Sequence, residues 1–407
     1  MGKFLKDNLS ARIKVAKRST LRELLKLIEK PDIISFAGGM PDPALFPVDL
    51  IKEACDHVLT NHSRFILQYG TSEGYLPLIQ EIAKRIELKE KTKVNEDEMI
   101  ITVGSQQGLD LIAKIFLNYG DIVIVEEPTY LGGLQAFRSY GGRFIGIPCD
   151  ESGMQVELIE DKLKELGKHE IKRIKFVYVV PDFQNPGGRT LSLERRKKLI
   201  ALAEKYDFLI VEDSPYKELR YRGEHKPSLF ALAPRGRVVM LCTFSKLFCP
   251  GFRVAYAIGE KDVIYQMVTG KQSTDLCTPA FNQAVLSYVL KKNALEPHIE
   301  KLITAYREKQ KCMLNSLDKY IPPLGMPSIE WTKPDGGLFL WMMMPEYIDT
   351  ERMFPRGLEN NIAYVMGADF FHDSSIKNCM RLNFSLPTLE KIEEGVKRLA
   401  EVINAEK

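Results

Sequence analysis

Lys246 is the residue of this chain whose setting best suits nucleophilic chemistry. It follows the apolar run VVMLC, and a Pro-Gly turn comes soon after it; an apolar run bounded by turn residues predicts a buried strand. A lysine at the end of such a strand loses hydration, and Arg253 seven residues later disfavours its charge, so both effects lower its pKa. A single lysine is more often a solvated surface group. The interpretation therefore depends on which groups the rest of the chain places beside Lys246.

Apolar strands that alternate with helices organise most of the chain. The expected strands lie at 99–103, 123–125, 144–147, 174–180, 208–212 and 238–242, with a further one at 254–258. Their near-continuous apolar character predicts a parallel sheet that is covered on both faces. In such sheets ligands bind beyond the carboxyl ends of the strands. The residues that follow each strand are therefore candidates for a common site.

Two strand ends and a turn carry groups suited to a flat, phosphorylated ligand. Ser105 and Gln106 begin a predicted helix, where free N–H groups and a hydroxyl can bind phosphate, although the same residues can serve only as a helix cap. Tyr130 follows the strand at 123–125 and offers a ring for stacking. Asn185 precedes a Pro-Gly turn, and because Asn is common in turns its signal is weak alone.

The last two parallel strands supply the charged groups. Asp213 directly follows a buried strand, which is a costly place for a carboxylate unless it is paired, and a heterocyclic N–H⁺ is a suitable partner; Tyr216 comes three residues later. Thr243, Ser245 and Arg253 offer two hydroxyls and a guanidinium to a phosphate. A phosphate cradle, a stacking ring, a partner for a ring nitrogen and a reactive amine together describe a pyridoxal 5'-phosphate (PLP) site.

Other classes of site find no support in the motifs. The chain contains neither G-x-G-x-x-G nor a P-loop, and no strand end carries a His-Ser pair or a carboxylate dyad. The six histidines have no ligand spacing and the seven cysteines form no C-x-x-C pair, so we expect no metal. The scattered cysteines suit a reducing cytoplasm. A net charge of +3 is too slight to indicate a nucleic-acid or membrane partner, and no apolar run is long enough to span a bilayer.

Three motifs resemble those of the class I and II aminotransferases of PLP fold type I, namely N-P-G at 185–187, D-x-x-Y at 213–216 and S-K-x-x-x-P-G-x-R at 245–253. The resemblance covers essentially the whole chain. The 2-aminoadipate and kynurenine aminotransferase-like branch is the most similar, through the stretches 19–47, 67–75 and 102–117.

This resemblance implies an α/β fold in which a large domain holds a mainly parallel seven-stranded sheet and a small domain is α+β. The expected parts are an N-terminal arm with part of the small domain at 1–47, a large PLP-binding domain at 48–290 and a C-terminal small domain at 291–407.

The resemblance also implies roles for the cofactor-binding residues. Lys246 forms the Schiff base and carries the proton, Asp213 keeps the pyridine nitrogen protonated, and Tyr130 stacks on the ring. Asn185 and Tyr216 hydrogen-bond the phenolic oxygen of the cofactor. The phosphate is held by Ser105, Gln106, Thr243, Ser245 and Arg253, joined by Tyr69 from the neighbouring subunit of a homodimer with shared active sites.

Substrate recognition is expected from three further positions. Arg381 would clamp the substrate carboxylate, with a buried arginine paired to an acid as the alternative. Gly39, in a Gly-rich loop, would let the backbone approach the substrate. Arg22 stands in the first turn of a helix predicted from the capping box of Thr20 and Glu23, and it could pair with a side-chain carboxylate of the substrate, with an ordinary exposed surface arginine as the alternative.

The expected function is ping-pong transfer of an amino group from an L-amino acid to a 2-oxo acid, with 2-oxoglutarate as the acceptor. The donor range of the branch covers 2-aminoadipate, glutamate, aromatic and large aliphatic amino acids. A PLP-dependent β-lyase or another carbanion enzyme on the same fold is the alternative. A distant alternative is the effector-sensing domain of a regulator, which would need a DNA-binding unit ahead of the predicted helix near residue 19.

Four residues depart from the usual family pattern. They are Gly187 in the Asn-Pro turn, Met366 ahead of the C-terminal loop, Cys249 beside the lysine loop and Asp182. Asp182 is expected to add negative charge near the cofactor ring, and Cys249 is a candidate for oxidation. We expect these departures to affect the substrate pocket without removing a cofactor contact.

Overall fold

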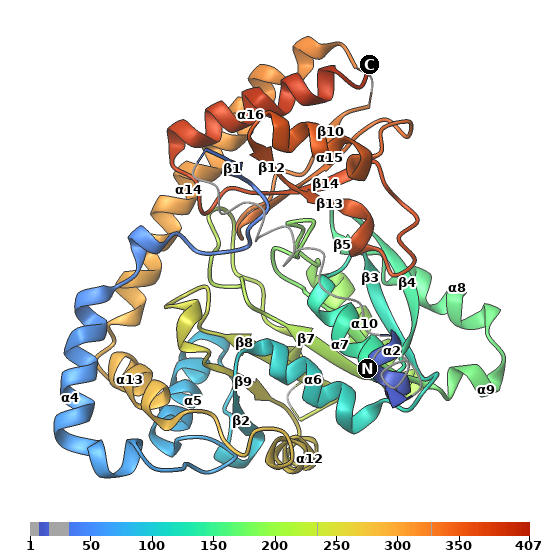
Figure 1. The fold of residues 1–407 in the computed structure, drawn as a ribbon. Coiled ribbons are helices and arrows are strands. Elements are labelled where there is room, and N and C mark those ends of the chain that lie inside the picture. The colour runs from blue at the N-terminus through green and yellow to red at the C-terminus, as the bar shows by residue number, and fades with distance from the viewer. Residues whose placement is uncertain (1–7, 16–31, 234, 327) are drawn as a thin grey trace.

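A large twisted sheet forms the centre of the protein in the computed structural model, which describes residues 8–15, 32–233, 235–326 and 328–407 (Figure 1). Its strand order is β2-β9-β8-β7-β6-β3-β4-β5. The strands are β2 (Met99–Thr102), β3 (Ile122–Glu127), β4 (Arg143–Asp150), β5 (Gly153–Met154), β6 (Ile174–Val179), β7 (Leu209–Asp213), β8 (Val238–Thr243) and β9 (Ala255–Ile258). All seven expected strands are present, and the two-residue β5 extends the sheet beyond β4 as a hairpin.

The pairing of the strands explains why polar residues far apart in sequence meet. The strands β8, β7, β6, β3 and β4 pair in parallel, so their carboxyl ends share one edge. β9 is antiparallel to both β8 and β2, so its amino end lies at that same edge. Arg253, two residues before β9, is thereby brought back beside the carboxyl end of β8. The predicted α/β class with a mainly parallel sheet is confirmed.

Helices occupy the connections before, between and after the strands of this sheet. They are α4 (Val48–Ile66), α5 (Leu76–Glu90), α6 (Ser105–Phe116), α7 (Leu131–Ser139), α8 (Glu157–Glu165), α9 (Lys168–Ile171), α10 (Leu193–Tyr206), α11 (Leu229–Leu232), α12 (Lys261–Gln272) and α13 (Ala280–Lys291). The short α2 (Ala11–Val15) contacts α7, while α6 packs on α7, α12, β8 and β9. The fully buried Leu109, Ile112 and Ala113 form the packing face of α6 at helical spacing.

The C-terminal elements gather at the opposite end of the molecule from α12 (Figure 1). An antiparallel sheet runs in the order β10 (Glu330–Trp331), β11 (Phe339–Met343), β14 (Cys379–Asn383) and β13 (Val365–Met366). A second small sheet pairs β1 (Ile34–Ser35) with β12 (Ile362–Ala363). The helices are α14 (Leu295–Tyr320), α15 (Thr350–Glu359) and α16 (Leu389–Asn404), and α14 packs along α16.

Short 3₁₀ turns complete the connections, among them η1 (Pro43–Leu45), η2 (Glu96–Glu98), η3 (Pro250–Phe252), η4 (Pro322–Leu324) and η5 (Gly367–Phe370). The predicted domain divisions at residues 48 and 291 stay predictions. The helix predicted near residue 20 lies outside the described residues. Within the described chain, no helix combines the length and apolar character that a membrane crossing requires.

Candidate active site at the carboxyl edge of the sheet

Lys246 lies in the turn after β8 with its amine directed at the backbone of the Gly-rich loop. Its Nζ donates a hydrogen bond to the carbonyl oxygen of Gly39 at 2.6 Å. Burial, together with the smaller effects of the positive charges on Arg381 and Arg253, lowers the pKa of Lys246 to about 8. A large share of such amines is neutral near pH 8, which is the state that a nucleophile needs.

Asp213 ends β7 with one carboxylate oxygen bound and the other free of any partner among the described residues. Its side chain is only 3% exposed, and Oδ2 accepts a hydrogen bond of 2.9 Å from the phenol of Tyr178. The buried Oδ1 has no hydrogen-bond partner. The pKa of Asp213 is raised to about 7, mainly by burial and also by the charge of Glu212, with the Tyr178 hydrogen bond acting in the opposite direction. A cationic donor at Oδ1 would relieve the cost of this buried carboxylate.

A cradle for an anion lies between α6 and the turn after β8. Ser105 begins α6, where backbone N–H groups lack helical partners, and its buried Oγ has no hydrogen-bond partner in the described chain. Thr243 Oγ1 and Ser245 Oγ lie 2.9 Å apart, and Arg253 Nη1 lies 3.4 Å from the same Ser245 oxygen. Gly104 has a φ of +76°, and a Cβ there would stand 2.1 Å from Nη2 of Arg253. The close approach of the guanidinium therefore requires glycine.

The first turn of α7 holds two further predicted residues together. Tyr130 immediately precedes α7, and the side-chain amide of Gln106 donates to the carbonyl oxygen of Gly132 at 2.9 Å. A Cβ at Gly132 would lie 2.5 Å from both the Tyr130 ring and Gln106 Oε1, so the missing side chain leaves room for both residues. Tyr130 is also close enough to Tyr216 and Arg381 to act electrostatically on their pKa values.

Arg381 is a buried guanidinium without an acidic partner among the described residues. Its side chain is 1% exposed, Nη1 donates to Asn185 Oδ1 at 2.9 Å and Nη2 donates to the carbonyl oxygen of Ala37 at 2.7 Å. The ring of Phe339 lies 4.3 Å from the guanidinium carbon. Burial lowers the pKa of Arg381 to about 10, and Nε has no partner in the described chain. The charge is therefore available to a bound anion.

Tyr216 completes the group beside Asn185. The side chain of Asn185 hydrogen-bonds the Tyr216 phenol, and burial raises the pKa of that phenol. The ring packs edge-on against Phe339 at a centroid distance of 5.6 Å. Asn185 therefore contacts both the phenol and the guanidinium of Arg381.

Of the predicted site residues that the structure describes, Tyr69 is not part of this cluster. Tyr69 lies between α4 and α5 with 79% of its surface exposed, and in the described chain its side chain forms no hydrogen bond to the cluster. Arg22 lies outside the described residues.

The departures from the family pattern have structural explanations. The charge of Asp182 is balanced by a buried ion pair with Arg196 at 2.9 Å and by Arg220 at 3.6 Å, so the expectation of added negative charge near the ring is wrong. Burial raises the pKa of Cys249 to about 11, which disfavours the thiolate that oxidation requires. The Gly187 N–H lies 3.3 Å from Gln184 Oε1, which supports the turn after Asn185. Met366 pairs in β13 with Met380, the neighbour of Arg381.

Sequence reasoning missed Tyr178 and Phe339. A phenol inside the apolar run of β6 requires a polar partner. Because Tyr178 pairs with Val211 in parallel register, its side chain shares a face with Asp213 two residues further on. That signal was present in the sequence, whereas the contact of Phe339 with Arg381 arises from folding of distant segments.

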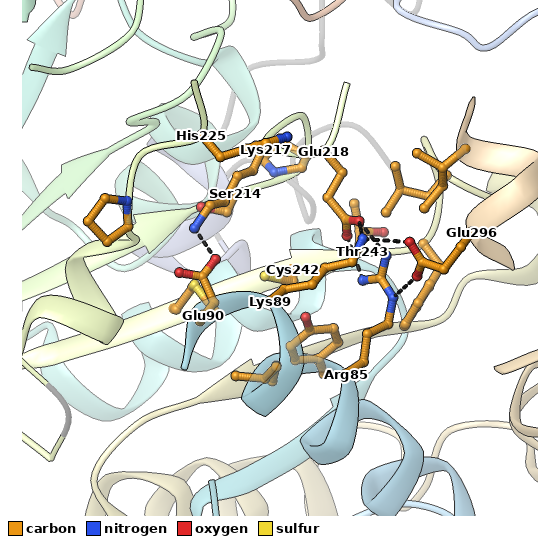
Figure 2. Close-up of a pocket in the computed structure, with 18 of the residues that line it drawn as sticks. Arg85, Lys89, Glu90, Ser214, Lys217, Glu218, His225, Cys242, Thr243 and Glu296 are labelled. Atoms are coloured by element: carbon orange, nitrogen blue, oxygen red, sulfur yellow. Dashed lines mark hydrogen bonds and ion pairs between the residues drawn. The ribbon is translucent and has the colours of Figure 1, made fainter. Parts of the chain in front are cut away.

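A separate cavity of about 490 Å³ lies between α5, α14 and the loops after β7 and β8 (Figure 2). Several of its charged side chains form ion pairs: Arg85 and Lys89 both contact Glu296 at 2.7 Å, and Lys217 pairs with Glu90. Thr243 lines the cavity as well as the cradle. These ion pairs connect α5 with α14 and with the loop after β7.

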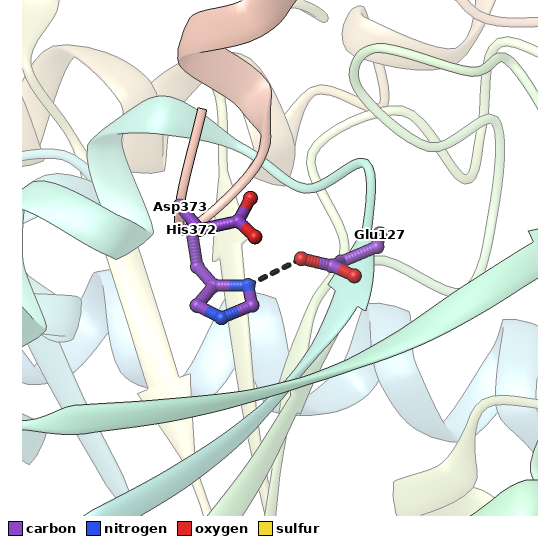
Figure 3. A group of neighbouring side chains, drawn as sticks. All are labelled: Glu127, His372 and Asp373. Atoms are coloured by element: carbon purple, nitrogen blue, oxygen red, sulfur yellow. Dashed lines mark hydrogen bonds and ion pairs between the residues drawn. The ribbon is translucent and has the colours of Figure 1, made fainter. Parts of the chain in front are cut away.

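Where β3 ends, Glu127 contacts a loop of the C-terminal part (Figure 3). His372 Nδ1 pairs with the Glu127 carboxylate, and Asp373 brings a third ligand-type atom within 4.8 Å of the other two. The hydrogen bond to the Glu127 carboxylate raises the pKa of His372. The absence of a bound metal stays a prediction.

Several known proteins are similar to this chain in sequence and in fold. The family model for aminotransferase class I and II matches residues 31–399. Aromatic-amino-acid aminotransferase 1 of Thermococcus litoralis is 46% identical over 390 residues, covering 96% of this chain and 92% of that protein. The kynurenine aminotransferase of Pyrococcus horikoshii, solved with PMP, has a TM-score of 0.94 and 44% identity, covering 99% of this chain and 98% of that one. The alpha-aminoadipate aminotransferase LysN of Thermus thermophilus, complexed with N-(5'-phosphopyridoxyl)-L-leucine, has a TM-score of 0.89 and 37% identity, covering 98% of each chain.

Proposed function

The chain belongs to the class I and II aminotransferase family, and from this premise we propose the reaction that it catalyses and the residues that carry it. It is a PLP-dependent enzyme. The reaction moves the amino group of an L-amino acid to a 2-oxo acid by a ping-pong course, with 2-oxoglutarate as acceptor. The observation that carries this proposal is the placement of Arg381, a buried guanidinium without an acidic partner in the described chain, in the same site as the amine of Lys246.

The residues of the site fit pyridoxal phosphate in three places. The unpartnered Oδ1 of Asp213 suits a protonated pyridine nitrogen, because the pair would neutralise a buried carboxylate. The unpartnered Oγ of Ser105, with the cradle that Gly104 leaves open, suits a phosphate. The amine of Lys246, with its lowered pKa, suits covalent attachment of an aldehyde. When bound, the cofactor supplies an electron sink for charge that develops on the substrate carbon.

The chain's own groups then have distinct tasks. Lys246 would hold the cofactor, and its amine would accept and return the proton of the substrate carbon. Asn185 and Tyr216 would hold the phenolic oxygen of the cofactor, and Tyr130 would stack on its ring. Arg381 fixes the substrate carboxylate with two parallel hydrogen bonds, which places the reacting carbon at the amine.

The donor range rests on the relatives. Those named above act on aromatic amino acids, kynurenine and alpha-aminoadipate by their names, and we assign the same range, with glutamate and large aliphatic amino acids, to this chain. Arg22 would pair with the side-chain carboxylate of acidic donors.

A homodimer with shared active sites fits the exposed residues that join α4 to α5. Tyr69 is surrounded in sequence by large apolar side chains that are also exposed, namely Phe65 at 59%, Leu67 at 69% and Leu76 at 47%. Apolar groups gathered on one surface mark an interface. In the dimer Tyr69 would reach the phosphate of the neighbouring subunit. The seven unpaired cysteines suit the reducing cytoplasm as the compartment.

The test is the visible absorbance of the purified protein during half-reactions. A single amino acid added without oxo acid should bleach the yellow cofactor band, and 2-oxoglutarate should restore it. The control is Lys246→Ala, which should show no covalently bound cofactor. Ranking single amino acids by bleaching rate gives the donor range. A band that never bleaches, or that bleaches with release of ammonia and pyruvate, contradicts amino transfer.

A further inference from the structure

We propose that Tyr178 is a positioning residue that orients Asp213 and keeps it anionic for the ring nitrogen of the cofactor. The inference rests on the proposed role of Asp213 in the reaction. Tyr178 supplies the one hydrogen bond that the Asp213 side chain receives from the described residues, at 2.9 Å to Oδ2. Because this bond engages Oδ2, the second oxygen stays free for another donor. A carboxylate held at one oxygen presents the other in a fixed direction.

The surroundings of Tyr178 hold its ring in place. The side chain is fully buried on β6, next to β7, and its ring packs edge-on against Phe137 of α7 at a centroid distance of 5.3 Å. A Cβ at Gly133 would lie 2.8 Å from the ring, so the glycine makes room for the ring under the first turn of α7. Tyr130 immediately precedes the same helix. The helix α7 therefore helps to position both Tyr130, the proposed stacking residue, and Tyr178, which hydrogen-bonds Asp213.

The electrostatic setting of Asp213 disfavours its charged form, and the phenol opposes that effect. Asp213 is buried beside Glu212, and burial and that neighbouring charge both raise its pKa. Glu126, whose own pKa burial raises to about 8, is near enough for Asp213 to contribute to that rise. The phenol acts against these effects by binding the charged form. Without the phenol Asp213 takes up a proton at higher pH, and a neutral carboxyl no longer holds the proton of the ring nitrogen as an ion pair.

Tyr178→Phe isolates this effect, because it removes only the hydroxyl and leaves the packed ring. The matched control is Tyr364→Phe, which removes another buried phenol whose hydroxyl donates to the carbonyl oxygen of Thr350 at 2.8 Å in the C-terminal part. Cofactor-free protein is titrated with PLP and with its carbocyclic analogue, in which carbon replaces the ring nitrogen. The measured quantity is the ratio of the two dissociation constants, which does not depend on turnover.

Wild type and the Tyr364 variant should prefer PLP over the analogue, and Tyr178→Phe should lose about tenfold or more of that preference. An unchanged preference in Tyr178→Phe overturns the role of Tyr178. If wild type itself shows no preference, the proposed role of Asp213 fails instead, and the two failures are distinct. Should Tyr178→Phe not fold, the same ratio is measured in Phe137→Leu, which keeps the hydroxyl but frees the ring; an undiminished preference there counts against the inference.

Discussion

The lowered pKa of Lys246 has a measurable consequence in the cofactor-free protein. With a pKa of about 8 instead of 10.5, about half of the Lys246 amines are neutral at pH ~8, compared with ~0.3% for an unperturbed lysine, a difference of about 150-fold. The rate of covalent attachment of PLP to the cofactor-free protein should therefore rise with pH and level off just above pH ~8, because only the neutral amine attacks the aldehyde. The growth of the visible absorbance band after rapid mixing measures this rate.

The positive charge of Arg381 is part of the cause, so Arg381→Gln tests the reasoning directly. This change removes a cation and admits water beside Lys246, and both effects raise the pKa, so the plateau should move to higher pH. Arg222→Gln removes the same charge from the surface, where Arg222 lies 3.4 Å from Asp335, and should leave the profile unchanged. A wild-type rate that keeps rising tenfold per pH unit up to pH ~10 would refute the argument.

Three further changes test other parts of the structure. Gly104→Ala should weaken PLP binding about tenfold or more, because the new Cβ meets Arg253, whereas Gly251→Ala, with nothing within 4 Å of its Cβ, should bind PLP as wild type does in the same titration. His372→Gln should lower the melting temperature at mildly acidic pH and have little effect at alkaline pH. The pair with Glu127 raises the pKa of His372 in the folded protein, so the charged imidazole stabilises the fold below the pKa of the unfolded chain, and this stabilisation is lost as the pH rises through the folded pKa. An equal loss of melting temperature at every pH would contradict the ion pair. Arg196→Met removes the nearer of the two cations beside the buried carboxylate of Asp182 and leaves only Arg220 at 3.6 Å, so it should cost up to about 3–5 kcal/mol in denaturant unfolding; a loss below about 1 kcal/mol would show that the pair with Arg196 is not needed.

Sequence reasoning located most of the cluster because one rule of sheet geometry sufficed. Parallel strands end at a common edge, so the residues after β3, β7 and β8 had to meet once the apolar runs were identified. Arg253 lies at the same edge because β9 runs antiparallel to β8. The motif around Lys246 predicted that Arg253 would be near the lysine, but it did not show the direction of the strand that follows Arg253. The strand bounds themselves followed from the length of the buried runs.

What the sequence did not contain was the partner of each buried charge. Asp182 looked like added charge near the ring because its partner Arg196 lies fourteen residues later on α10, and nothing local marks that side chain as turning inward. The contact of Arg381 with Phe339 depends on the register of β11 against β14. Such pairings are decided by packing between elements, which periodicity does not encode.

Some polar atoms of the site that lack a partner face the proposed cofactor position and others face the proposed substrate position, and Asn185 contacts residues of both groups. Asp213 and Ser105 each leave one buried oxygen without a partner in the described chain, on the side that the cofactor would occupy, while Arg381 keeps an unbalanced charge for the substrate. Buried polar groups without partners destabilise a protein, so each ligand relieves a cost that the folded chain carries in its absence. Asn185 accepts a hydrogen bond from Arg381 and binds the Tyr216 phenol, so the substrate clamp and the proposed cofactor contact share one side chain. The orientation of Asn185 is therefore set jointly by both halves of the site, while the turn that carries it is held by the hydrogen bond from the Gly187 N–H to Gln184.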